Sequence, residues 1–504
     1  MWFEVAIVGT PLVLLAGSVA FVVVYADRAD KSALSSTVAT FAIFLAMCTI
    51  FLLPFDLFTL GDRAGTLSGY HEGIKIAYLA FYCLLAAFAF FLLPFVYFFY
   101  EEEDGTGETF PQAVRACKYT VGVVIAIIAI VSLAYVVRLG KLDPSSSTVD
   151  DLLSFVVGAM LTVGLAGWVS YTAYGLAYLP LQALQVTAEA PDRSLSLTAG
   201  EEVEAELLRI HAQIEYLQAR YMNQPSSAWS KEDRLELVKL EHRERQLAQQ
   251  QDAVVREVER LPSAPSFLSR VMHGVIGVVY LLLSLLVATS LLLGTIDRGL
   301  NSTCGFSCGF QIDGPSLPDP IGLLLVLASS AFPADLICFA VLVGYLFLAT
   351  LTGIIQLGVR ILCIRLYAIS PRRTKPNAMM MAIWLLLFLL VAINVQILVL
   401  APQYATFGPQ AIAGPDGESR PCRLHDWQDD VSSTRTPCAL SELARFNKAV
   451  FANIPLIGTL TFVSNILLLI VMCCTSIWTL CVVRRRAHLR DIEGTDDLAE
   501  YLVS

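Results

Sequence analysis

Nine long runs of mostly apolar residues constrain this 504-residue chain more than any other feature of its sequence. A helix needs about 20 residues to cross the hydrocarbon of a bilayer, where backbone polar groups must be paired within the protein. Only 15% of the residues are charged, against about 25% in soluble domains. The sequence therefore predicts an all-α polytopic integral membrane protein. Its expected spans lie near 4–25, 36–58, 73–100, 116–137, 150–180, 271–294, 334–359, 379–400 and 450–482.

The end of the third run marks a sharp change of environment. The stretch FLLPFVYFFY (91–100) is followed directly by four carboxylates, EEED (101–104). Aromatic side chains are enriched where a transmembrane helix meets water. We therefore place a membrane boundary at Tyr100 and Glu101.

Lysine and arginine in short loops set the expected orientation, because such loops stay in the cytosol. Placing them there puts the N-terminus in a lumen or outside the cell and the C-terminus in the cytosol. The one N-x-S/T sequon, at Asn301, is then lumenal and is the expected glycosylation site. The basic residues follow the first, seventh and ninth spans: Arg28, Lys31, Arg360, Arg365, Arg372, Arg373, Lys375, Arg484, Arg485, Arg486 and Arg490.

One segment is polar enough to form a soluble unit. Within 181–270, apolar residues recur at heptad spacing, which is typical of helices that pack as a coiled coil. The pattern predicts a cytosolic helical hairpin, and it also fits an arm that docks a partner's helix. The expected regions are spans one to five in 1–180, the hairpin in 181–270, spans six to nine in 271–482 with lumenal loops 295–320 and 401–449, and a cytosolic tail in 483–504.

A shorter apolar stretch, IGLLLVLASSAF (321–332), precedes the seventh span and is followed by Pro333. It is too short to cross a bilayer as a helix. Two interpretations fit it equally: a re-entrant or interfacial half-helix, and the start of a long tilted helix.

Sequence signatures of catalysis are absent. The chain has no Walker A phosphate loop, no H-E-x-x-H, no nucleophile elbow and no paired C-x-x-C zinc pattern. No basic stripe suggests a nucleic acid as partner. We expect no enzyme activity, no catalytic cofactor and no metal site.

Polar residues inside or near the spans are the main functional candidates, because placing them in hydrocarbon is costly. Such residues form hydrogen bonds between helices or line a cavity, whereas carboxylates near span ends also suit the membrane interface. The candidates are Asp56, Asp335, Asn394, Gln396, Asn453 and Asn465.

Three cysteine pairs allow different chemistry. Cys422 and Cys438 share a loop predicted to be lumenal, where a disulfide persists, and they form the better candidate pair. Cys304 and Cys308 are close enough to pair or to stay free. Cys473 and Cys474, near the cytosolic end of the last span, are candidates for palmitoylation or act as apolar filler.

Several stretches resemble the limb-region family of nine-span membrane proteins, and within it the lysosomal cobalamin transport escort proteins. The likeness covers nearly the whole chain in the same order. The stretches are PFVYFFYEEED (94–104), FPADL (332–336), IRLYAISPRRTKPNAM (364–379), LAPQYATFGPQ (400–410) and CC (473–474).

The resemblance implies a glycoprotein of the lysosomal membrane that is needed to export cobalamin to the cytosol. It implies an escort that acts with an ABC transporter, which supplies the energy. Two alternatives stay open: a transporter or channel for cobalamin in its own right, and a plasma-membrane receptor for a lipocalin-type carrier that uses the 401–449 loop. A homo-oligomer is compatible with each of them.

An odd number of spans predicts that the two termini lie on opposite sides of the membrane. An epitope tag at the N-terminus should be protected from protease added to the cytosolic side, whereas a tag at the C-terminus should be cleaved. Sugar attached to Asn301 would agree with this layout, and equal cleavage of both tags would contradict it.

Overall fold

The computed structural model describes part of the chain in detail. The described residues are 2–26, 32–61, 68–102, 109–138, 148–188, 207, 209–211, 213–214, 216, 237, 240, 244, 267–301, 317–329, 331, 333–361, 364–367, 369, 374–413, 419–422 and 438–503.

The described part of the chain contains nine helical stretches that are long and apolar enough to cross a membrane, which confirms the predicted fold class. The third stretch joins α3 to α4, and the fifth joins α6 to α7, through single π-helical turns. The helices are α1 (Trp2–Tyr25), α2 (Ala33–Gly61), α3 (Ser68–Ala87), α4 (Leu93–Glu101), α5 (Thr109–Arg138), α6 (Thr148–Gly167), α7 (Ala173–Ala188), α10 (Phe267–Asn301), α11 (Pro320–Ala328), α12 (Ala334–Leu357), α13 (Pro376–Leu400), α14 (Pro402–Phe407), α15 (Glu442–Asn453) and α16 (Pro455–Val503), with the π turns η1 (Phe88–Leu92) and η3 (Trp168–Thr172).

Three segments refine the sequence prediction. The ninth span crosses with only part of its expected range, 450–482, as the sequence allows: 450–453 belong to α15, and the spanning helix α16 starts afresh at Pro455, since proline favours the first turn of a helix. The stretch 321–332 is not the start of a long tilted helix, because α11 is a separate helix that ends before α12 begins. Helix α16 continues to Val503, so the expected tail is part of the same helix.

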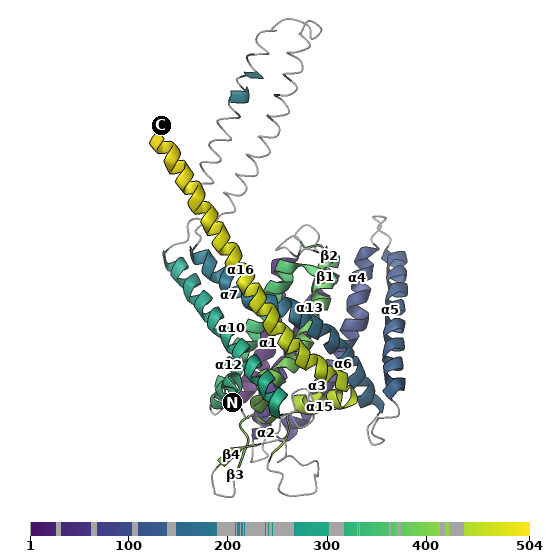
Figure 1. The fold of residues 1–504 in the computed structure, drawn as a ribbon. Helices are drawn as coiled ribbons and strands as arrows, with labels where there is room; N and C mark the ends of the chain where they lie inside the picture. The colour runs from purple at the N-terminus through teal and green to yellow at the C-terminus, as the bar shows by residue number, and fades with distance from the viewer. Residues whose placement is uncertain are drawn as a thin grey trace. The chain divides into compact units, whose positions relative to one another are not determined.

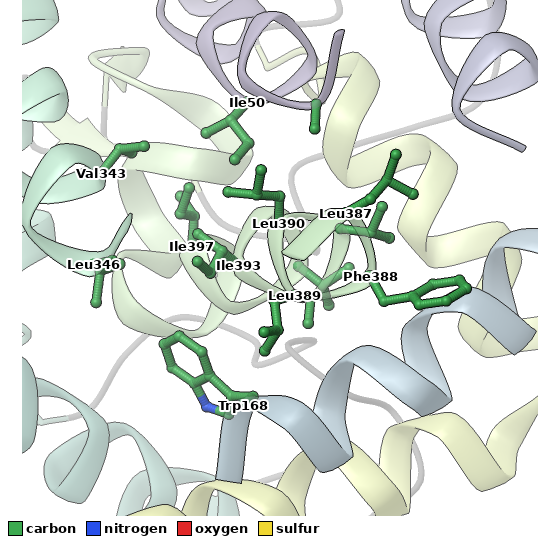
Figure 2. Close-up of a cluster of buried hydrophobic side chains, with 14 of the residues drawn as sticks. Ile50, Trp168, Val343, Leu346, Leu387, Phe388, Leu389, Leu390, Ile393 and Ile397 are labelled. Atoms are coloured by element: carbon green, nitrogen blue, oxygen red, sulfur yellow. The ribbon is translucent and has the colours of Figure 1, made fainter. Parts of the chain in front are cut away.

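Helix α13 is the centre of the bundle and is buried along nearly its whole length. Gly164 and Gly167 let α6 approach α13 closely, because a side chain at either position would overlap Phe388 or Leu389. Small residues at helix contacts are the usual way to pack helices within a membrane. Figure 2 shows this core, with Ile50 from α2, Trp168 from η3, Val343 and Leu346 from α12, and Leu387, Phe388, Leu389, Leu390, Ile393 and Ile397 from α13.

Polar side chains lie against both π turns. A π turn disturbs the regular pairing of backbone groups, which in a membrane must be repaired by the protein itself. In η1 the indole N–H of Trp384 donates to the carbonyl of Ala89 over 2.7 Å. In η3 the hydroxyl of Tyr171 accepts the backbone N–H of Arg360 at 3.0 Å. Next to it the hydroxyl oxygens of Thr172 and Thr350 are 2.8 Å apart.

Two glycines bring the fifth span against α12. A Cβ at Gly175 would overlap the carbonyl oxygen of Ala349, and a Cβ at Gly353 would overlap that of Tyr171. The two contacts are reciprocal, so each helix presents a glycine to the backbone of the other. Helix α12 and the fifth span can therefore meet at backbone distance only because both positions lack a side chain.

Two short antiparallel hairpins lie at opposite ends of the bundle (Figure 1). Strands β1 (Val359–Ile361) and β2 (Ile364–Tyr367) follow α12. Strands β3 (Ala411–Ala413) and β4 (Ser419–Pro421) follow α14. We call the end that carries β3 and β4 the disulfide end.

Residues Leu181–Val279 form a compact unit of their own. Of its described residues, Ile210 and Ile214 are buried and pack against Leu207, Leu237 and Leu240. His211 Nε2 lies 2.6 Å from Glu244 Oε1. These contacts join two parts of the segment for which the heptad pattern predicts a helical hairpin.

Replacing Gly175 by alanine should destabilise the bundle, because the new Cβ forces α7 away from α12. We expect a loss of about 1–3 kcal/mol, the usual cost of overpacking, seen as a lower melting temperature of the purified protein in detergent. Gly344→Ala is the matched control, since a Cβ there meets no atom within 4 Å. Equal melting temperatures for the two variants would contradict the close crossing.

Candidate functional site

Buried polar side chains gather at the disulfide end. Asp56 lies near the end of α2 and Asn394 near the end of α13, while Asp335 and Glu442 lie in the first turns of α12 and α15. Consecutive spans run in opposite directions, so the ends of some helices meet the beginnings of others at one level. Residues far apart in the sequence are thereby collected in one layer.

The centre of this layer is a group that we call the acid–imidazole cluster: Asp56, His71, Glu442 and Arg445. Asp56 is fully buried, and its Oδ2 accepts the backbone N–H of Glu442 over 2.7 Å. His71 lies between the two carboxylates, with Nδ1 3.6 Å from Asp56 Oδ1 and Nε2 3.6 Å from Glu442 Oε1. Arg445 donates to Glu442 Oε1 over 2.5 Å. The cluster ties α2, α3 and α15 together.

Burial raises the pKa of the Glu442 carboxyl above its ordinary value of 4.5, because the charged form loses its water. The Arg445 guanidinium opposes this rise in the pKa, and the Asp56 carboxylate adds to it. His71 and Lys75 act in the same direction as Arg445. The charges around Glu442 therefore compensate its burial only in part.

A line of aromatic hydroxyls extends the cluster along α3. His71, Tyr78 and Tyr82 recur at helical spacing, so they share one face of α3. Tyr78 and Tyr82 are buried, and their ring centroids are 6.4 Å apart. Tyr82 stacks on Phe446 of α15 at 4.6 Å, and its hydroxyl accepts from the side-chain amide of Asn394 at 3.0 Å. We call the residues from His71 and Asp56 through Tyr78 and Tyr82 to Asn394 the polar column.

Another buried carboxyl group, that of Asp335, lies near the start of α12. Tyr404, in the short helix α14, places its hydroxyl 3.5 Å from Asp335 Oδ2. Both residues are buried. Burial raises the pKa of Tyr404 well above its usual value, and the nearby Asp335 charge raises it further. The Tyr404 hydroxyl therefore remains a donor toward the Asp335 carboxyl.

A small cavity of about 10 Å³ lies between the end of α10, the segment just before α11 and the junction of α13 with α14. Its volume is close to the room that one water molecule needs. Its lining includes Ser290, Arg298 and Asp319. The Ser290 hydroxyl lies 2.7 Å from Asp319 Oδ1 and 2.8 Å from the carbonyl oxygen of Leu400. Burial raises the pKa of Asp319, and the hydrogen bond from Ser290 opposes that rise. These contacts join α10 to α11 and to the end of α13.

The six polar candidates from the sequence occupy different surroundings. Asp56 and Asn394 belong to the polar column, and Asp335 pairs with Tyr404. Gln396 is fully buried, and within the described residues neither of its amide atoms has a hydrogen-bond partner. Asn465 is buried in α16, whereas Asn453 is the last residue of α15.

Five residues of these buried groups were not among the candidates from the sequence: His71, Tyr78, Tyr82, Glu442 and Arg298. The helical spacing of His71, Tyr78 and Tyr82 is a signal that could have shown them on one face. Glu442 gave no such signal, because it lies in a loop in the sequence prediction and reaches Asp56 only in the folded chain.

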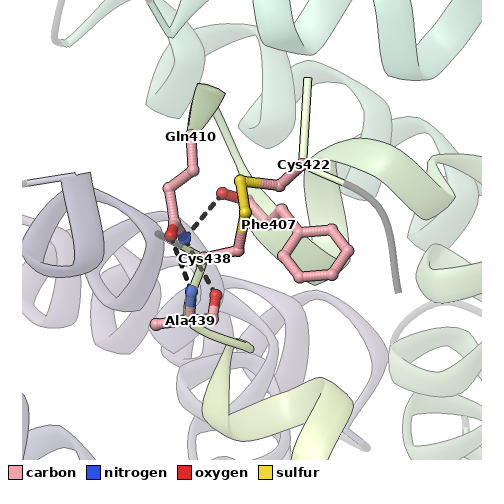
Figure 3. Close-up of a disulfide and its surroundings, with 5 residues drawn as sticks. All are labelled: Phe407, Gln410, Cys422, Cys438 and Ala439. Atoms are coloured by element: carbon pink, nitrogen blue, oxygen red, sulfur yellow. Dashed lines mark hydrogen bonds between the residues drawn. A yellow bond between two sulfur atoms is a disulfide. The ribbon is translucent and has the colours of Figure 1, made fainter. Parts of the chain in front are cut away.

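The structure joins Cys422 to Cys438 in a disulfide at the disulfide end, the pair that the sequence favours. Figure 3 shows it beside Gln410, whose side-chain amide bonds to both the N–H and the carbonyl of Ala439 at 2.9 Å. These contacts fix the chain that leads into α15.

The other cysteine candidates and the sequon at Asn301 lie on helices or outside the described residues. Cys473 and Cys474 carry free thiols exposed on α16, and Asn301 is the last residue of α10, with its amide 2.7 Å from Asp297 Oδ1. Cys304 and Cys308 lie outside the described residues. Among the residues that the structure describes, no group of three His, Cys, Asp or Glu could hold a metal ion.

The hydrogen bond between Asn394 and Tyr82 can be tested with a double-mutant cycle. Tyr82→Phe, Asn394→Leu and the double variant should show a coupling of about 0.6–1.7 kcal/mol, the range for hydrogen bonds between membrane helices. Unfolding of the purified protein in mixed micelles measures it. Tyr119→Phe with Asn394→Leu is the matched control, because Tyr119 is exposed on α5. Strictly additive effects of Tyr82→Phe and Asn394→Leu would contradict the bond.

Comparisons with known proteins agree with this architecture. The family model of the LMBR1-like membrane proteins matches residues 4–276. The chain is 25% identical to a probable lysosomal cobalamin transporter of Nematostella vectensis, over 95% of this chain and 94% of that protein. Proteins with the same name in Neurospora crassa and Podospora anserina are 28% and 29% identical, over 79% and 86% of this chain and 72% and 80% of theirs. No solved structure matches the chain. The chain belongs to the LMBR1-like membrane protein family.

Proposed function

We propose that this protein resides in the lysosomal membrane and is required for the export of cobalamin to the cytosol, where it acts as an accessory of an ABC transporter. The observation that carries the proposal is the likeness to probable lysosomal cobalamin transporters of an animal and of fungi along most of the chain. We also propose the orientation with a lumenal N-terminus and a cytosolic C-terminus.

The accessory role is supported by what the sequence lacks and by how the bundle is packed. The chain has no Walker A loop, so an ATP-driven step of that kind has to come from a partner. Helix α13 fills the centre of the bundle, and α6 packs closely against it at Gly164 and Gly167. Cobalamin, a corrin ring that carries a nucleotide, is far larger than a side chain, so a conduit would require these helices to separate.

A transporter in its own right is the second candidate, and two observations favour it. The relatives are named transporters. The polar column also extends from the partly exposed His71, past the carboxyl of Asp56, to the buried amide of Asn394, as sites that couple ion binding to movement do.

Deleting the gene should cause cobalamin to accumulate in lysosomes, because export stops. Purified lysosomes loaded with labelled cobalamin provide the measurement, and the wild-type chain should restore release. Gly344→Ala should restore release as well, whereas Gly175→Ala should restore less. Unchanged lysosomal cobalamin after deletion would overturn the proposal.

Two further measurements separate the candidates. Capture of the full chain from lysosomal membranes in mild detergent should recover an ABC transporter. Sealed vesicles that contain only this protein should take up no cobalamin. Flux in those vesicles without a partner would favour the second candidate and contradict the accessory role.

A further inference from the structure

His71 occupies an unusual position between two carboxylates from different elements. Its two ring nitrogens lie at the same distance, 3.6 Å, from Asp56 Oδ1 on α2 and from Glu442 Oε1 on α15. The His71 side chain is 26% exposed, whereas those of Asp56 and Glu442 are 0% and 8% exposed. The imidazole therefore links solvent to two carboxylates that water hardly reaches.

A neutral imidazole does not suit this position. It has one N–H donor and one nitrogen lone pair, so one of the two carboxylates would face a lone pair. A protonated imidazole donates from both nitrogens and is attracted to both carboxylates. At 3.6 Å the two contacts are longer than hydrogen bonds, and what they favour is a positive ring between two carboxylates. The arrangement therefore favours one more proton than a neutral histidine with two carboxylates holds, whichever of the three groups carries it.

The charges around His71 do not replace that proton. Arg445 is committed to Glu442 Oε1, and Lys75 acts on Glu442 only through space. Asp56 has the N–H of Glu442 on Oδ2, and within the described residues its Oδ1 has no hydrogen-bond partner. Tyr78 also lies near Asp56 and Glu442, but within the described residues its hydroxyl has no hydrogen-bond partner, and the Tyr404 hydroxyl donates to Asp335 instead. Asp56 is thus a fully buried carboxyl with one hydrogen bond among the described residues, and a positive charge on His71 would compensate that burial.

We propose that Asp56, His71 and Glu442 form a proton-binding site, and that the bound proton fastens α15 to α2 and α3 at the disulfide end. The site binds its proton in an acidic compartment and loses it in a neutral one, because an imidazole ordinarily changes its charge between these two pH ranges. The proposal stands independently of cobalamin, since it concerns the proton and the contact between helices alone.

Loss of the proton should also affect the segment that leads into α15. The N-cap residue of α15, Ser441, donates from its hydroxyl to the carbonyl of Ala405 over 2.6 Å and from its backbone N–H to the carbonyl of Thr406 over 2.9 Å, both in α14. The disulfide residue Cys438 lies three residues before Ser441 in the same segment. Loosening the start of α15 therefore loosens the segment that holds the disulfide loop to the bundle.

Hydrogen–deuterium exchange of the full chain in lipid nanodiscs tests the proposal. Protection factors of the α15 peptide, corrected for the intrinsic pH dependence of exchange, are compared at about pH 5 and about pH 7.5, on either side of the ordinary imidazole range. In the wild type, protection of α15 should be about tenfold higher at the acidic pH, which corresponds to one unit of differential proton affinity. A peptide from the middle of α13 should not change.

Two substitutions at His71 move the result in opposite directions. His71→Gln removes the proton acceptor and should give low protection of α15 at both pH values. His71→Lys carries a permanent positive charge and should give high protection at both. His211→Gln is the matched control, because His211 also lies beside a carboxylate, Glu244, but outside the cluster. It should keep the wild-type pH dependence.

Three results would overturn the proposal. The first is equal protection of α15 at the two pH values in the wild type. The second is a His71→Gln protein that keeps the wild-type pH dependence. If that variant does not fold, the His71→Lys protein decides instead, because a wild-type pH dependence in it excludes His71 as part of the proton-binding site.

Discussion

A backbone in hydrocarbon has no water to bond with, and this constraint shapes every unusual feature of the bundle. Each N–H and carbonyl must be paired inside the protein. Where the third and fifth spans depart from regular α-helix, side-chain hydrogen bonds connect the turn to other parts of the chain. Trp384 bonds to a carbonyl of η1, while Tyr171 of η3 accepts a backbone N–H at the start of β1. The irregular turns are therefore anchored in the tertiary structure.

The same constraint explains why helices pack through glycine. Lipid tails are as apolar as leucine side chains, so burial of apolar surface drives helices together less than close packing does. Gly164 and Gly167 bring α6 to α13, and Gly175 and Gly353 bring the fifth span to α12. The result is a core around α13 in which large side chains fit against backbone.

Charged and polar groups follow the opposite logic. They are costly within the bundle, and the buried carboxyl groups among the described residues lie near helix ends. At the disulfide end the carboxyl groups of Asp56 and Glu442 flank the imidazole of His71, and Asp335 accepts a long hydrogen bond from the Tyr404 hydroxyl. A layer of this kind is sensitive to the proton concentration on its own side of the membrane, which fits a protein proposed to work at an acidic compartment.

The sequence by itself determined the spans and the class of the protein, because hydrocarbon thickness acts on local composition: about 20 apolar residues are visible in any window. It also pointed to Asp56, Asp335 and Asn394, since a polar residue in an apolar run stands out without knowledge of its neighbours. Only the tertiary structure decided the partners. Asp56 and Glu442 are 386 positions apart, and nothing local in either segment encodes their hydrogen bond. It forms because α2 ends and α15 begins at the same level of the bundle, and that level is fixed by how all the helices pack together.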